Sequence, residues 1–193
     1  MAVNLSKGQK VSLEKAGAAG LSRVSLGLSW GMREKKGFFG SKQVEVDLDA
    51  SCLLFAGQQQ VDVVWFRSLT SRDGSVRHSG DDRRGGGGAD ADNEVITVDL
   101  GKLPPQVDTL IFTVNSFLND SFEGIPNARC RLIDTAGDRE LARFELSLDG
   151  GNHTGMVMAK LYREGAAWHL QAIGENGTGR TFKEMMPLIG RYL

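Results

Sequence analysis

Residues 23–30 read RVSLGLSW, and this stretch decides the fold class. One of its faces carries the apolar residues Val24, Leu26, Leu28 and Trp30, and the other face carries serine and glycine. Alternation with a period of two is typical of a β-strand that buries one face, because successive side chains of a strand point to opposite sides. The stretch is therefore predicted to be a strand with one face in the core.

Further segments of this kind follow along most of the chain. They are mostly short, rich in β-branched or aromatic residues, and bounded by Gly, Asp, Asn or Pro, as strands of antiparallel sheets are. The candidates are residues 43–49, 52–55, 61–69, 95–100, 109–115, 128–134, 139–146, 155–163 and 168–173. Strands without long helices between them predict an all-β fold, a β-sandwich of two mainly antiparallel sheets.

Two segments depart from this pattern. In residues 182–193 the apolar side chains approach helical spacing, so we expect a short C-terminal helix that caps one end of the sandwich. Pro187 is expected to shorten or kink that helix. Residues 31–40, which contain KKGFFG, interrupt the strand candidates and are expected to form a surface loop.

The composition describes an ordinary globular chain. Its 193 residues fit one sizeable domain, and we expect residues 1–193 to form a single β-sandwich domain. The 23 lysines and arginines nearly balance the 24 acidic residues, which argues against nucleic acid as a partner, because phosphate binding needs surplus cations. No apolar run approaches the roughly 20 residues of a transmembrane helix, and the N-terminus lacks the apolar core of a signal peptide. We therefore expect a cytoplasmic protein.

The segment 80–94, GDDRRGGGGADADNE, combines five carboxylates with four consecutive glycines between two strand candidates. A glycine run orders poorly because of its conformational entropy, and clustered carboxylates repel one another. A hard cation such as Ca²⁺ offsets both costs, because it takes roughly 6–8 oxygen ligands from carboxylates, carbonyls and water. The segment is therefore interpreted as a loop that a bound cation orders.

A second acidic group precedes this loop in the chain. Glu45, Asp47 and Asp49 alternate along one strand candidate, which predicts that they project from the same face. A sandwich readily brings a strand end and a loop together, so the two acidic groups are predicted to hold one or two calcium ions. The alternative is a solvated outer face, since charged strand positions are usually exposed.

Other kinds of site find less support in the residues. An EF-hand is excluded because Val95 stands where that loop requires glycine and no helices flank it. No G-x-S-x-G motif or other signature of a catalytic triad accompanies the serines and histidines, and His78 is expected at the surface at a strand end. The arginines at positions 67, 72, 77, 83 and 84 are interpreted as ion pairs and solvated edges, with a site for a small oxyanion such as phosphate as the alternative.

Several motifs, in their order along the chain, resemble the TerD tellurium-resistance family. They are LSKGQKVSLEK (5–15), VSLGLSW (24–30), DLDAS (47–51), SRDGSVRHSGDDR (71–83), FTVNSF (112–117), NARCRLID (127–134) and MVMAKLYREGAAWHLQAIGENG (156–177). Residues 35–40, KKGFFG, are similar to the TerZ-like branch of that family. The similarity covers nearly all of the chain.

This resemblance implies a β-sandwich that binds calcium through a bipartite acidic site, in a family with no established catalytic activity. It also implies a role with other stress-response or Ter-type proteins in bacterial tellurite resistance. Together with the acidic pattern, it predicts the metal ligands Asp47, Asp49, Asp81, Asp82, Asp90, Asp92 and Glu94. Gly85–Gly88 replace the family's G-E-G-x-G centre and remove a carboxylate, so we expect weaker or single-site calcium binding.

The sequence therefore predicts a non-enzymatic calcium-binding protein in which Ca²⁺ orders the acidic Gly-rich loop for interaction with partner proteins. Two alternatives stay open. One is a metal-independent scaffold subunit of a stress-response complex, which the glycine substitutions favour. The other is an enzyme that handles small oxyanions with the arginines around the loop.

Overall fold

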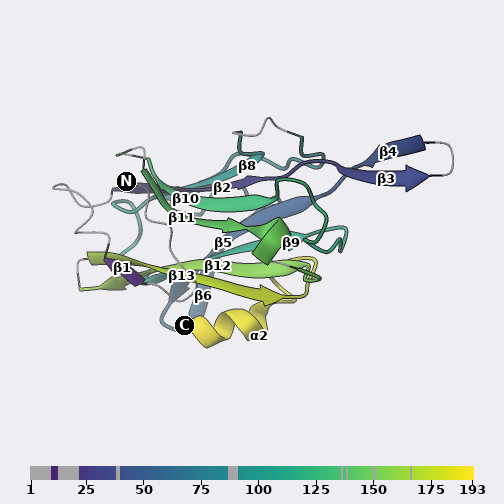
Figure 1. Ribbon diagram of the computed structural model, residues 1–193. Coiled ribbons are helices and arrows are strands. Elements are labelled where there is room, and N and C mark those ends of the chain that lie inside the picture. Colours follow the sequence, from purple (N-terminus) through teal and green to yellow (C-terminus); the bar gives the residue numbers. More distant parts are fainter. Residues whose placement is uncertain are drawn as a thin grey trace.

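Two antiparallel β-sheets pack face to face in the computed structural model, which describes residues 10–12, 22–37, 40–86, 91–135, 137, 139–149, 151–165 and 167–193 (Figure 1). The first sheet has six strands, in the order β1 (Lys10–Ser12), β13 (Ala167–Gly177), β12 (Gly155–Glu164), β9 (Thr109–Ser116), β5 (Leu48–Ala56) and β6 (Gln59–Val64). The second has five strands, in the order β11 (Arg139–Glu145), β10 (Arg129–Asp134), β2 (Arg23–Ser29), β8 (Glu94–Asp99) and β7 (Val76–His78). The predicted β-sandwich is confirmed.

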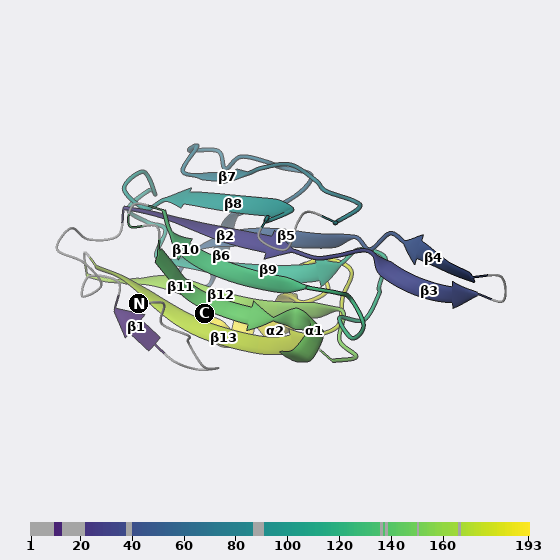
Figure 2. The ribbon, with the colours of Figure 1, turned by 45° about the horizontal axis from the view of Figure 1, so that its top comes forward.

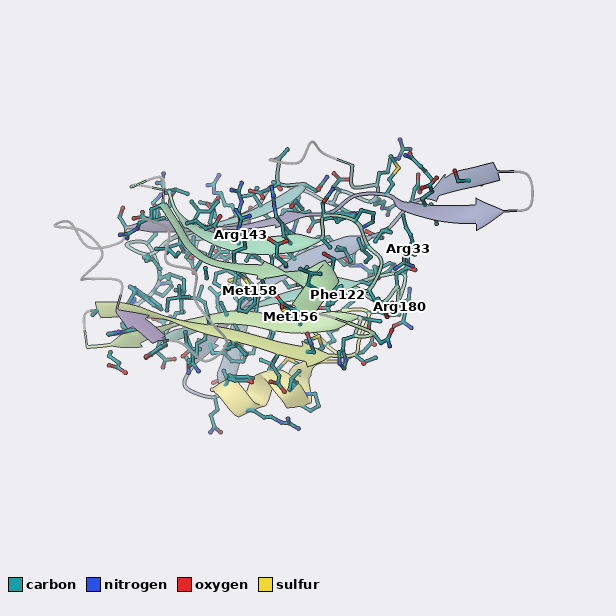
Figure 3. The ribbon with its side chains drawn as sticks, in the orientation of Figure 1. Arg33, Phe122, Arg143, Met156, Met158 and Arg180 are labelled. Atoms are coloured by element: carbon teal, nitrogen blue, oxygen red, sulfur yellow. The ribbon has the colours of Figure 1, made fainter. Side chains whose placement is uncertain are left out.

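The apolar faces of the two sheets form one continuous core. Leu26 of β2 and Phe112 of β9 are both fully buried in it. Figure 3 shows Phe122, Met156 and Met158 in the layer between the sheets, and all three belong to the same cluster. Burying a side chain of this size stabilises the folded state by roughly 1.5–3 kcal/mol. The apolar residues of the alternating pattern therefore hold the two sheets together.

A second apolar cluster lies on the outer face of the six-stranded sheet. Phe182 and Ile189 of the C-terminal segment pack there with Leu53 of β5. The segment forms the short helix α2 (Met186–Ile189) and the 3₁₀ turn η2 (Gly190–Tyr192), beneath the sheet in Figure 1. A short C-terminal helix is thus confirmed, but it covers a sheet face instead of an end of the sandwich, because its apolar residues match the outward side chains of β5.

Helices are short in the part of the chain that the structure describes. Besides α2, the α-helix α1 spans Leu146–Asp149, between β11 and β12. Within the described residues, neither helix has the length or the apolar character that crossing a bilayer requires.

An antiparallel hairpin projects beyond the two sheets where the sequence predicted a surface loop (Figure 2). It consists of β3 (Arg33–Gly37) and β4 (Gly40–Val44). Arg33 anchors its base, because the guanidinium donates hydrogen bonds of 3.0 Å to Asp120 Oδ1 and 2.8 Å to the Ser121 carbonyl. The loop prediction was wrong because the segment lacks alternating apolar residues, although its backbone pairs as strands.

Residues 43–49, predicted as one strand, are divided between two. β4 ends at Val44, β5 begins at Leu48, and residues 45–47 connect them. The indole Nε1 of Trp30 donates a 2.7 Å hydrogen bond to the carbonyl of Val46, which takes this carbonyl out of any strand ladder. Glu45 and Asp49 therefore do not share one strand face, contrary to the prediction.

Candidate metal centre

Three aspartates from two distant segments meet beside the start of β5. Asp47 precedes the strand, Asp49 lies within it, and Asp81 lies in the segment between β7 and β8. Each offers one carboxylate oxygen, and the three oxygens lie within 4.8 Å of one another. That spacing fits oxygens around a single cation, since Ca²⁺–oxygen bonds are about 2.3–2.6 Å long.

Two of these carboxylates are buried and lack partners. Asp49 is 4% exposed and Asp47 is 9% exposed. Asp47 Oδ1 and Asp49 Oδ2 are buried atoms without a hydrogen-bond partner. A buried carboxylate oxygen without a partner is costly, so the observation points to a group that the pair accepts from outside the chain.

The electrostatics of the cluster oppose ionisation in the absence of a cation. Burial, followed by the negative charges of Glu94, Asp47 and Asp81, raises the pKa of Asp49 from its usual 3.8 to about 8. Burial and the charges of Asp81 and Glu94 raise the pKa of Asp47 to about 6. A divalent cation reverses this effect, because an opposite charge nearby favours the ionised carboxylates.

Pairing with β9 fixes the positions of the two strand-end aspartates. The backbone N–H of Phe117, just beyond β9, donates a 2.9 Å hydrogen bond to the Asp47 carbonyl. Within the strands, Asp49 pairs with Asn115 of β9. Both aspartates are therefore held by the backbone of a strand in the middle of the six-stranded sheet.

Trp30 holds the Gly-rich loop against the body of the protein. Its backbone N–H donates to Asn93 Oδ1 at 3.0 Å, and its carbonyl accepts a 2.9 Å hydrogen bond from Gly86. Gly85 has a φ of +66°, and a Cβ there would lie 2.4 Å from Trp30 Nε1. Glycine is needed at this position for both reasons, so part of the glycine run serves close packing.

Glu94 links the loop to β5 from a fully buried position. Its carboxylate accepts hydrogen bonds from the backbone N–H of Ala50 at 2.9 Å and of Asp82 at 3.2 Å. His78 Nε2 lies 3.3 Å from Glu94 Oε2 without good hydrogen-bond geometry, and His78 Nδ1 accepts the N–H of Gly80 at 3.0 Å. His78 was expected at the surface but is buried, because its ring packs between Glu94 and the turn that precedes Asp81.

Asp82 faces backbone groups of its own loop. Its carboxylate accepts hydrogen bonds from the N–H groups of Arg84 at 2.9 Å and Gly85 at 3.1 Å, and from the side chain of Asn93 at 3.0 Å. Although burial opposes ionisation, these hydrogen bonds lower the pKa of Asp82. The residue therefore shapes the loop, and the structure does not bring it into the cluster of three aspartates.

Asp92 lies on a different surface of the protein. Arg131 of β10 donates three hydrogen bonds to the Asp92 carboxylate, from Nε to Oδ1 at 3.0 Å and to Oδ2 at 3.3 Å, and from Nη2 to Oδ2 at 2.9 Å. Gly27 of β2 is the strand partner of Arg131, and a Cβ on Gly27 would lie 2.2 Å from Asp92 Oδ2. Asp92 is thus apart from the cluster, and Asp90 lies outside the described residues.

The three aspartates open into a pocket of about 570 Å³ whose aromatic and aliphatic lining residues the sequence did not reveal. Its remaining lining residues are Glu45, Phe66, Arg67, Arg83, Phe117 and Leu118. Phe66 and Phe117 stack edge to face, with ring centroids 5.6 Å apart.

Most arginines near the loop form the ion pairs that the sequence suggested. The pairs are Arg83 with Asp81 at 3.2 Å, Arg84 with Glu45 at 3.5 Å and Arg72 with Asp62 at 3.8 Å. The three arginine side chains are largely exposed, so each ion pair stabilises the folded protein by only about 0–1 kcal/mol.

Comparison with known proteins identifies the family of this chain. A model of the TerD domain matches residues 1–187. The chain is 44% identical to tellurium resistance protein TerZ of Serratia marcescens over 187 residues, which covers 95% of this chain and 94% of that protein. It is 36% identical to stress response protein SCP2 of Bacillus subtilis (strain 168), with all of both chains covered, and 37% identical to tellurium resistance protein TerD of Serratia marcescens, with 93% of each covered.

A solved structure supports the same fold at lower identity. The crystal structure of a homologue of telluride resistance protein (TerD) from Streptomyces coelicolor A3(2) superposes with a TM-score of 0.70 at 23% identity. The match covers 83% of this chain and 92% of that one. With the domain match over nearly the whole length and relatives of 36–44% identity, this chain belongs to the TerD family.

Proposed function

We propose that this protein is a non-enzymatic calcium-binding protein of the tellurite-resistance and stress-response type. Ca²⁺ is held by Asp47, Asp49 and Asp81, and it fixes the Gly-rich loop as part of a surface for partner proteins. The observation that carries the proposal is the pair of buried carboxylate oxygens, Asp47 Oδ1 and Asp49 Oδ2, which have no hydrogen-bond partner and lie beside Asp81.

The donor set fits a hard cation. All three candidate ligands are carboxylates, which suit Ca²⁺ and Mg²⁺, whereas zinc sites in proteins are built mostly from cysteine and histidine. Three carboxylates supply from three to six oxygens, depending on how many bind through both atoms. Water and backbone carbonyls complete the roughly 6–8 ligands of Ca²⁺, which tolerates irregular geometry better than Mg²⁺ does.

Bound calcium would join two segments that are remote in the chain. Asp47 and Asp49 lie at the start of β5, while Asp81 lies in the acidic loop. Glu94 already ties this loop to Ala50 of β5, and Trp30 ties it to Val46 just before the strand. The ion thus removes the repulsion between buried carboxylates and adds a link between strand and loop. The loop becomes more ordered, and its surface is presented to partners only when calcium is present.

The names of the relatives support the proposed role in tellurite resistance and stress response. Their names denote tellurium resistance or stress response, and none of the names given above denotes a reaction. For this chain we propose the same setting, with the calcium-loaded surface binding other proteins of the stress response.

Calcium titration with two readouts tests the proposal. Calorimetry at pH 7.5 should give one saturable site, and thermal unfolding should move to higher temperature with Ca²⁺ relative to chelator. A Mg²⁺ titration is the matched control and should give weaker binding. Superimposable melting curves with calcium and with chelator, together with no heat of binding, would refute the proposal.

A further inference from the structure

The pocket beside the three aspartates is lined by Arg67, which forms no ion pair with a described acidic group, although its positive charge acts on Asp49 and partly offsets the effect of burial, which raises the pKa of that carboxyl. Arg67 is exposed, and its guanidinium lies over the rings of Trp65 and Phe66, 5.6 and 5.2 Å from their centroids. None of the described acidic groups forms an ion pair with it, whereas Arg83, the other arginine of the pocket, is paired with Asp81 at 3.2 Å. Stacking orients the planar guanidinium and leaves its N–H donors available.

The candidate metal site is open to the pocket on one side. Asp47, Asp49 and Asp81 are the only acidic cluster with metal-ligand spacing among the described residues, and they line the floor of the open pocket. A calcium ion held by three carboxylates needs further oxygen ligands. On the pocket side, these ligands must come from solvent or from a molecule that enters the pocket.

One part of the pocket rim is apolar. Leu118 is 54% exposed, although it is a large hydrophobic residue. Next to it, Phe117 stacks against Phe66 and is held from behind by Arg180, whose Nε donates a 2.8 Å hydrogen bond to the Phe117 carbonyl. The Arg180 guanidinium also lies 4.7 Å from the centroid of the Phe117 ring. An exposed leucine beside ordered aromatic rings is a surface that an apolar side chain of a partner can cover.

Resting on the calcium site proposed above, we propose that the pocket binds an acidic side chain of a partner protein. One carboxylate oxygen completes the coordination of the metal ion, and the other accepts hydrogen bonds from Arg67. An apolar residue next to the acidic one in the partner packs on Phe117 and Leu118. Partner binding is then calcium-dependent, because the calcium ion is one of the two cationic groups that bind the carboxylate.

A carboxylate fits this site better than a phosphate does. The pocket offers one unpaired guanidinium and one metal ion, which match the two oxygens and single charge of a carboxylate. A phosphate group carries more charge and a third acceptor oxygen, for which the described lining residues provide no further unpaired cation. The apolar rim also has no role in binding a free inorganic ion.

The test uses Tb³⁺ as a luminescent substitute for Ca²⁺ in the full chain. Luminescence lifetimes in H₂O and D₂O report the water molecules that remain bound to the ion. The probe is the blocked dipeptide N-acetyl-Asp-Leu-amide, and the matched control is N-acetyl-Asn-Leu-amide. We expect the Asp dipeptide to displace coordinated water and the Asn dipeptide to displace none at the same concentration.

Two variants assign the effect to the pocket. Arg67→Gln should bind the Asp dipeptide at least about tenfold more weakly, the equivalent of 1.4 kcal/mol, and its Tb³⁺ affinity is measured in the same titration. Arg72→Gln, which removes an exposed arginine that pairs with Asp62 outside the pocket, should bind the dipeptide like the parent protein.

The outcomes separate this inference from the calcium proposal. Failure of the parent protein to bind Tb³⁺ or Ca²⁺ would overturn both. Normal metal binding with no displacement of water by the Asp dipeptide would overturn the carboxylate site alone. Displacement of water by inorganic phosphate at lower concentration than by the dipeptide, with the same dependence on Arg67, would also overturn it and identify a phosphate site.

Discussion

The carboxylate of Glu94 accepts a 2.9 Å hydrogen bond from the backbone N–H of Ala50, the residue that follows Asp49. This bond joins the end of the acidic loop to the strand that carries the buried aspartate. Because Glu94 is fully buried and also accepts the N–H of Asp82, it fixes the distance between the two halves of the metal site. Glu94 is therefore assigned a positioning role.

Glu94→Gln should destabilise the protein and weaken calcium binding together. Each oxygen of the Glu94 carboxylate accepts a backbone N–H, so the amide NH₂ of glutamine must face one of these donors. Losing a hydrogen bond to a charged buried group costs about 1.5–3 kcal/mol, which urea unfolding with chelator will measure. The control is Glu45→Gln, an exposed residue of the pocket rim, which should change stability by less than about 0.5 kcal/mol. Equal effects of the two substitutions would contradict the positioning role.

Calcium dependence should vanish in Asp49→Asn and persist in Asp92→Asn. Asp49 belongs to the cluster of three aspartates, whereas Asp92 is bound to Arg131 on another surface. At a calcium concentration a hundredfold above Kd, the free energy of unfolding of the parent protein should increase by about 2.7 kcal/mol. This increase raises Tm by roughly 5–10 °C for a chain of this length. Asp49→Asn should show no calcium shift, and its Tm in chelator should exceed that of the parent protein. A lost shift in Asp92→Asn would mean that the loop reorganises to include Asp92.

The calcium-free protein should lose stability as pH rises from about 4 to 8. The folded-state pKa values of Asp47 and Asp49 are about 6 and 8, above the usual 3.8, so the folded state binds more protons than the unfolded state in this range. Their contribution to stability is complete below pH 4 and is lost as pH rises through 6 and then 8. Tm in chelator should therefore be higher at pH 5 than at pH 8.

Calcium should alter that pH profile. The ion competes with protons for the same carboxylates, so the Tm difference between calcium and chelator should grow from pH 5 to pH 8. Asp49→Asn provides the control, because its Tm in chelator should depend less on pH over this range. A Tm in chelator that rises steadily between pH 5 and pH 8 would contradict the raised pKa values.

Gly85→Ala should damage the site through backbone strain and a steric clash. Gly85 has a φ of +66°, and a Cβ there would lie 2.4 Å from Trp30 Nε1, the atom that donates to the Val46 carbonyl. Gly74→Ala is the matched control, since Gly74 has a φ of +73° and nothing within 4 Å of the added Cβ. Both substitutions carry a backbone cost of about 1–3 kcal/mol. Only Gly85→Ala should also weaken calcium binding in calorimetry, and equal affinities in the two variants would argue against the role of Trp30.

The fold could be predicted from the sequence because a strand that buries one face carries apolar residues at every second position. Strands such as β2 and β9 face an apolar layer, and their inward side chains alternate with residues that contact the other side. The hairpin of β3 and β4 was missed for the opposite reason. It packs on neither sheet, so burial leaves no alternating pattern in its sequence.

The candidate site could be predicted only in part. The sequence indicated that the segments around Asp49 and Asp81 come together, because both are acidic and flank strands. It could not indicate that Asp92 finds Arg131 across Gly27, or that His78 is buried against Glu94. Each of these contacts depends on the order of the strands in the sheet, and the local periodicity of the sequence does not determine that order.

A crystal structure grown in calcium tests the central claim most directly. We predict one ion with oxygen ligands from Asp47, Asp49 and Asp81 at about 2.3–2.6 Å, with Asp92 still bound to Arg131. An ion bound only elsewhere, or three carboxylates that remain without an ion at saturating calcium, would contradict the account.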